Sequence, residues 1–190
     1  HRSRSYDEKR KFGRRLASVH QYVCGLFRNY NALLVLRLDL RLQEKSIFSS
    51  DASDAKRILS RFLNNSRGRP LLFRHLLGHI WRLEFHPNAG FFFHVVLVFD
   101  GHAELRTPTD LSKEIGAYWV KEICDNQGDY FDWSLIKEPR KSVGIGRVRW
   151  NDDSAIQTLK QSINILAESE RYVRAKCLAH ERCFGMGNLP

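Results

Sequence analysis

The stretch Gly90-Phe-Phe-Phe-His-Val-Val-Leu-Val-Phe-Asp-Gly101 is an aromatic and β-branched run that closes with a turn-forming Asp-Gly pair. Such side chains fit a pleated surface, so the run predicts a β-strand. Successive strand residues point to opposite faces, which places His94 on the same side as Phe92 and Val96. Both sides of the run are mostly apolar. We therefore expect the central strand of a sheet, with both faces covered.

The segments before this run supply its neighbours in the sheet. Residues 78–86 alternate in polarity and lead into the turn residues Pro87-Asn-Ala-Gly90, so a hairpin is expected that brings Glu84 near His94 on one face. Residues 33–42 predict a further strand with leucines on one side. Its other side carries three charged residues, Arg37, Asp39 and Arg41. Shorter strands are expected at 130–137 and 143–150.

Helical periodicity appears between these strands and at both ends of the chain. Residues 1–28 form a basic amphipathic helix that is either a solvated face of a packed helix or a surface that lies against phosphates. Further helices are expected at 51–63, 107–124 and from 151 onward. The order βαββαβ is typical of ferredoxin-like α+β folds, in which an antiparallel sheet carries helices on one face and leaves the other available for a site. We divide the chain into the helix 1–28 and a domain 29–190.

The composition favours a polyanionic partner. The chain has 31 Lys+Arg against 21 Asp+Glu and a formal net charge of +10, and clustered cations release counterions from a phosphate backbone. Nucleic acid is the first candidate and an acidic membrane surface the second. No apolar run approaches the roughly 18–20 residues of a membrane span, and scattered cysteines suit reduced thiols, so a cytoplasmic protein is expected. Gly144-x-Gly146 lacks the third glycine and helix start of a nucleotide loop.

Several blocks resemble the filamentous-phage (inovirus) gene-II-like replication initiators, also seen as the YagK/YfjJ C-terminal domain. These blocks, from about residue 33 to the end, are Leu36-Arg-Leu-Asp-Leu40, Gly78-His-Ile-Trp-Arg-Leu-Glu84, the run 90–101, Ile115-Gly-Ala-Tyr-Trp119, Gly144-Ile-Gly-Arg147, Tyr172-Val-Arg-Ala-Lys176 and Arg182-Cys-Phe-Gly185. The resemblance implies the rolling-circle (HUH) initiator fold with a five-stranded sheet. It also implies a prophage or mobile-element setting. The implied activity is metal-dependent nicking of single-stranded or hairpin DNA through a phosphotyrosine intermediate.

The chain departs from this pattern at two places. Phe92 stands where the family has the first histidine of its His-hydrophobe-His motif, and a phenylalanine cannot ligate a metal. Ile165 and Glu168 stand where a tyrosine and a lysine are expected. Two substitute nucleophiles are open: Tyr118 with Lys121, and Tyr172 on the last helix. Tyr118 also fits a core aromatic beside Trp119.

Two readings of the histidine remain open. His94 could hold Mg²⁺ or Mn²⁺ together with Glu84 and Asp39, or with His86, because carboxylates suit these ions. Alternatively, His94 is hydrogen-bonded in the core and Glu84 pairs with Arg37 or Arg82.

We expect a DNA-binding domain that derives from a replication initiator and has lost or weakened nicking activity. Its candidate contacts to single-stranded or hairpin DNA are Arg37, Arg41, Arg82, Arg147 and Arg149 on the sheet, Arg14 and Arg15 on the first helix, and Phe92 as a stacking ring. An active metal-dependent nickase-ligase is the alternative. A protein-interaction module without DNA binding is the second alternative.

Overall fold

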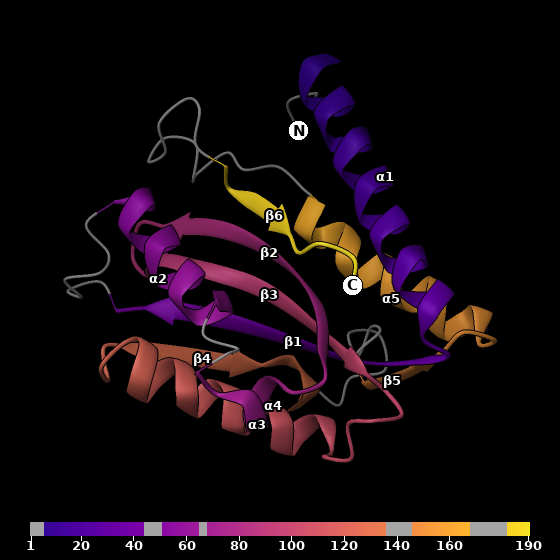
Figure 1. Ribbon diagram of the computed structural model, residues 1–190. Helices are drawn as coiled ribbons and strands as arrows, with labels where there is room; N and C mark the ends of the chain where they lie inside the picture. Colours follow the sequence, from indigo (N-terminus) through magenta and orange to yellow (C-terminus); the bar gives the residue numbers. More distant parts are fainter. Residues whose placement is uncertain (1–5, 44–50, 65–67, 136–145, 168–181) are drawn as a thin grey trace.

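The computed structural model describes residues 6–43, 51–64, 68–135, 146–167 and 182–190 (Figure 1). Within these ranges the chain forms an α+β fold around an antiparallel sheet. In chain order the elements are α1 (Tyr6–Asn29), β1 (Ala32–Leu42), α2 (Ala52–Asn64), α3 (Pro70–Phe73), β2 (Leu76–His86), β3 (Gly90–Asp100), α4 (Pro108–Tyr118), a π-helical turn (Trp119–Ile123), β4 (Gly128–Asp132), a 3-10 turn (Trp133–Leu135), β5 (Gly146–Arg149), α5 (Asp153–Ala167) and β6 (Phe184–Met186).

The sheet has the strand order β4-β1-β3-β2-β6, and all of its pairings are antiparallel. The prediction that residues 90–100 form the central strand is confirmed. β4 and β5 lie end to end along the same edge of β1, at its C-terminal and N-terminal parts respectively. The described residues contain six strands, so the expected count of five is wrong. The strand that was missed, β6, has only three residues and no alternation of polarity to reveal it.

One face of the sheet, the helix face, packs against α2, α3 and α4. It collects the even-numbered leucines of β1 and the odd-numbered residues of β3, among them Leu38 and Phe93, which are fully buried. α2 covers this face with the apolar stripe that the sequence predicted, and the Asp51 carboxylate caps its start by accepting a hydrogen bond of 2.8 Å from the Asp54 N–H.

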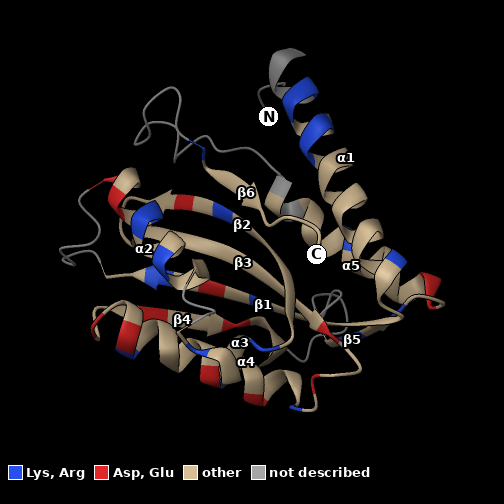
Figure 2. Cartoon of the chain, viewed as in Figure 1, with Lys and Arg blue, Asp and Glu red and all other residues tan. Residues whose placement is uncertain are grey.

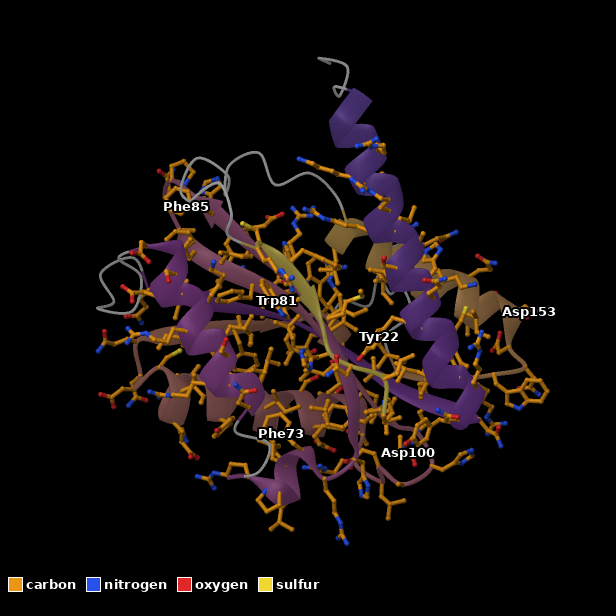
Figure 3. All side chains as sticks on the ribbon, turned by 45° about the horizontal axis from the view of Figure 1, so that its top comes forward. Tyr22, Phe73, Trp81, Phe85, Asp100 and Asp153 are labelled. Carbon is orange, nitrogen blue, oxygen red and sulfur yellow. The ribbon has the colours of Figure 1, made fainter. Side chains whose placement is uncertain are left out.

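The opposite face, the second face, is partly covered by α1 and α5, which lie side by side in Figure 1. The prediction that helices pack on one face only is therefore wrong. Val19, Val23 and Leu26 of α1 are buried with the β-branched residues of the sheet, because both sides of β3 are apolar and each side needs a cover. Among the residues that Figure 3 labels, Tyr22 of α1 belongs to the core of the second face and Phe73 of α3 to that of the helix face.

The helices α1 and α5 cover only part of the second face. Val35, Ile80 and Val96 lie beneath them, whereas the continuations of the same strands carry charged side chains on that face. At the hairpin end, Gly90 has φ 71°, a left-handed conformation that suits glycine at a tight turn. Among the described helices, none is long and apolar enough to span a bilayer.

Candidate functional site

The site is a row of side chains that crosses the sheet on the second face. Directly opposed residues of antiparallel strands point to the same side, so the register alone defines the row. From β6 to β4 it reads Phe184, Arg82, His94, Asp39 and Phe131. Four strand spacings of about 4.8 Å make the row about 19 Å long. It has an aromatic ring at each end and polar side chains between.

His94 lies at the centre of the row between two carboxylates. Its Nδ1 is 2.6 Å from Asp39 Oδ1, and its Nε2 is 3.3 Å from Glu84 Oε2. The imidazole side chain is 12% exposed and that of Asp39 8%. The hairpin prediction that Glu84 lies near His94 is confirmed. Glu84 also forms an ion pair with Arg82, which extends the cluster to a third strand position.

This geometry bears directly on the candidate metal ligands His94, Glu84 and Asp39. Ligands of one ion must converge on a point, but these two carboxylates contact opposite nitrogens of the ring. Within the described ranges, no group of three or more His, Cys, Asp or Glu side chains is arranged to hold a metal ion. His86 is the exposed last residue of β2, and its Nδ1 accepts a hydrogen bond of 3.3 Å from the N–H of Asn88 in the turn.

Phe92 shares the second face with His94, as the period of the strand requires. Its ring stands perpendicular to the imidazole, with 5.2 Å between the ring centroids. Across the sheet it opposes Arg41 on one side and Glu84 on the other. Phe92 is half-buried and Arg41 exposed, so an aromatic surface and a cation adjoin next to the row.

Two aromatic residues of the site were missed in the sequence. Phe131, at the end of the row, is 37% exposed, and its ring lies 5.5 Å from that of Trp133. Trp133 in turn lies over the guanidinium of Arg37, with 3.9 Å between its ring centroid and the Arg37 Cζ. Their spacing in the sequence, 131 and 133, is the alternation that could have placed both on one face.

The other arginines predicted to bind DNA fall into separate places. Arg147 opposes Leu34 of β1, and Arg149 opposes Ala32. Both arginines therefore lie on the helix face of the sheet, opposite to the face that carries His94. The Arg147 guanidinium donates hydrogen bonds to main-chain carbonyls of the loop after β3, including that of Glu104 at 2.5 Å. Arg147 therefore ties β5 to this loop.

Arg14 and Arg15 lie on α1 next to the Phe184 end of the row. Together with Lys11, Ser18, Phe184 and Met186 they line a groove of about 300 Å³ between α1 and β6. The Arg15 guanidinium lies 5.7 Å from the centroid of the Phe184 ring. Figure 2 shows blue on the N-terminal half of α1, and Arg28 adds a basic residue in its last turn. The basic groove thus continues the row beyond the edge of the sheet.

The candidate nucleophiles do not lie on the second face within the described residues. Tyr118 is 5% exposed and packs against Phe62 and Phe73 in the core of the helix face. Lys121 is exposed on the π-helical turn and lines a cavity of about 560 Å³ with Tyr118. Tyr172 and Glu168 lie outside the described residues.

In comparisons with known proteins, no family model and no curated protein matches the chain.

Proposed function

We propose that the chain is a DNA-binding domain with the ferredoxin-like fold of rolling-circle (HUH) initiators, and that its nicking activity is lost or weakened. It binds single-stranded or hairpin DNA across the second face of the sheet. Its role is the replication or regulation of a phage or mobile element in the cytoplasm. The crossovers support the fold: β1-α2-β2 and β3-α4-β4 give the central strand order β4-β1-β3-β2.

The observation that carries the proposal is the row from Phe184 to Phe131. Aromatic rings stack on any base, and cations beside the rings bind the phosphates that join successive bases. The row has a ring at each end and the exposed Arg41 beside it, whereas Arg82 between the rings is buried and paired with Glu84. The basic groove of α1 adds Lys11, Arg14 and Arg15 at one end. A strand laid across the sheet meets both kinds of group along its path.

Weakened nicking is supported by the surroundings of His94. An apolar ring, Phe92, occupies the position two residues before it on the same face. Both imidazole nitrogens already face carboxylates, and Glu84 is also paired with Arg82. A metal ion would have to displace Arg82 from Glu84 before His94 and Glu84 could bind that metal ion together.

One feature favours the alternative of an active nickase. A carboxylate on Nδ1 of a histidine orients the ring so that Nε2 can bind a metal, and Asp39 stands in that position. His94 Nε2 and Glu84 would then hold Mg²⁺ or Mn²⁺, which polarises the phosphate that a tyrosine attacks. Incubation with hairpin DNA and Mn²⁺, followed by a denaturing gel, tests this. A covalent adduct that Tyr172→Phe abolishes would overturn the proposal of weakened nicking.

DNA binding is tested by fluorescence anisotropy with labelled single-stranded and hairpin oligonucleotides at increasing salt. The logarithm of the affinity should fall linearly with the logarithm of the salt concentration. Phe131→Ala should weaken binding by about 1–3 kcal/mol, the value of one stacked base. Leu71→Ala is the control, because Leu71 is 81% exposed on α3, which packs on the helix face. Absence of binding at moderate salt would instead favour a protein-interaction module.

A further inference from the structure

Arg37 is a buried arginine that forms no ion pair with a carboxylate of the described residues. It lies on β1 within the second face and is 6% exposed. Among the described residues its Nε has no hydrogen-bond partner. Asp39, two residues along on the same face, directs Oδ1 to His94 instead. The guanidinium instead packs against the ring of Trp133.

Such a placement is costly for the folded protein. Removing a cation from water carries a penalty that only an ion pair with good hydrogen bonds repays. Burial lowers the pKa of Arg37, and the charge of Asp39 offsets this only in part. Stacking on an indole compensates by about 2 kcal/mol when the cation is desolvated. Within the described part of the chain, the Nε of Arg37 thus keeps unused hydrogen-bonding capacity next to the row.

The ligand that fits this edge is a phosphate. A guanidinium presents a rigid fork of donors that matches the oxygens of a phosphodiester, and a ring stacked on its face leaves the edge free. The formal net charge of +10 attracts a polyanion, and Phe131, whose ring packs on Trp133, offers a stacking surface beside the fork. A phosphodiester with a base on each side satisfies both groups at once.

We infer that Arg37, held in place by Trp133, anchors a backbone phosphate of single-stranded DNA on the second face, with Trp133 as its positioning residue. The inference rests on the proposed DNA binding and names the contact that anchors it. We therefore expect Arg37 to contribute to binding of the ligand more than to the stability of the fold.

The test combines DNA affinity with stability in four variants. Arg37→Met removes the charge and keeps the apolar stem, while Arg57→Met removes the same charge from α2, where the Arg57 side chain is 72% exposed on the opposite side of the sheet. Trp133→Leu removes the stacking ring, and Trp133→Phe keeps one. Each is measured by anisotropy with a labelled single-stranded 20-mer over a salt series, and by urea unfolding.

Arg37→Met should weaken binding about ten- to hundredfold, the value of a hydrogen bond to a charged group. It should also reduce the salt slope by about 0.7, the value of one phosphate contact on a single strand. Its urea midpoint should be equal to or above that of the parent protein. Arg57→Met should change affinity by about twofold at most, as expected for an exposed and screened charge. Trp133→Leu should weaken binding, whereas Trp133→Phe should restore most of it.

Two results would overturn the inference. One is an unchanged affinity and salt slope in Arg37→Met while the parent protein binds DNA, which leaves the proposed function intact. The other is a large fall in the urea midpoint of Arg37→Met, because that identifies an arginine that the fold itself requires. If the parent protein fails to bind DNA, the proposed function fails first. Should Arg37→Met not fold, the Trp133→Leu and Trp133→Phe pair decides by its affinities.

Discussion

Replacing Gly78 with alanine tests how α1 docks on the second face. Gly78 lies on β2, and a Cβ placed on it would collide with the hydroxyl oxygen of Tyr22 from α1 and lie 3.0 Å from that ring's Cζ. Tyr22 is 6% exposed, and its hydroxyl accepts a hydrogen bond of 3.3 Å from the N–H of His79. The added methyl group must therefore displace a packed ring together with its hydrogen bond.

The expected loss of stability is the sum of two costs and one smaller gain. Overpacking a core costs about 1–3 kcal/mol, and losing the hydrogen bond to Tyr22 about 1 kcal/mol. Alanine is favoured over glycine within a strand by about 0.5–1 kcal/mol. Gly78→Ala should thus lower the free energy of unfolding by about 1–3 kcal/mol, measured by urea denaturation with linear extrapolation.

A double mutant identifies the cause. Tyr22→Phe removes the hydroxyl that collides, so Gly78→Ala should cost about 1–2 kcal/mol less in that background than in the parent protein. Gly13→Ala is the matched control on α1, because its added Cβ meets no described atom within 4 Å apart from the adjoining helix backbone. It should stabilise the helix by up to about 1 kcal/mol. Equal costs of Gly78→Ala in the two backgrounds would refute the docking of Tyr22 on Gly78.

Three further measurements probe groups that the fold buries. Arg106→Ala should lower the free energy of unfolding by about 3 kcal/mol at pH 7, because it leaves the buried carboxylate of Glu104 without its partner. The hydrogen bond from Arg106 lowers the pKa of Glu104, so this stability is present above pH 4.5 and is lost as the pH falls further. Urea unfolding at pH 7 and pH 4 should therefore show a smaller loss of stability in the variant at pH 4. Burial lowers the pKa of His79 below 6.5, so the protein should lose stability as the pH falls through and below that value. His79→Gln should flatten the pH dependence of the unfolding free energy between pH 7.5 and 5.5. Equal slopes in the parent protein and the variant would contradict this. Burial also raises the pKa of the Cys124 thiol to about 12, so at pH 8 iodoacetamide should label the exposed Cys24 of the native protein far faster than Cys124. In urea the two cysteines should be labelled at similar rates, which peptide mass spectrometry can follow. Equal rates in the native protein would show that Cys124 is accessible.

Local patterns in the sequence were enough to identify the central strands and the residues that share a face with His94. Alternation with a period of two is a property of the extended chain itself, so it placed Phe92 beside His94 before any partner strand was known. The turn residues before Gly90 determined the hairpin, and with it the approach of Glu84 to His94. The apolar stripe of α2 is likewise read from 3.6-residue periodicity.

The contacts that give the site its chemistry depend on residues far apart in the chain. Asp39 reaches His94 through the pairing of β1 with β3, and Trp133 covers Arg37 because β4 adds to the edge of β1. The covering of the second face by α1 and α5 likewise follows from long-range packing, because an amphipathic helix shows which side is buried but not against what. Periodicity therefore assigned faces to residues, while only the tertiary structure decided which groups meet on them, since register and helix docking are set by burial summed over the whole sheet.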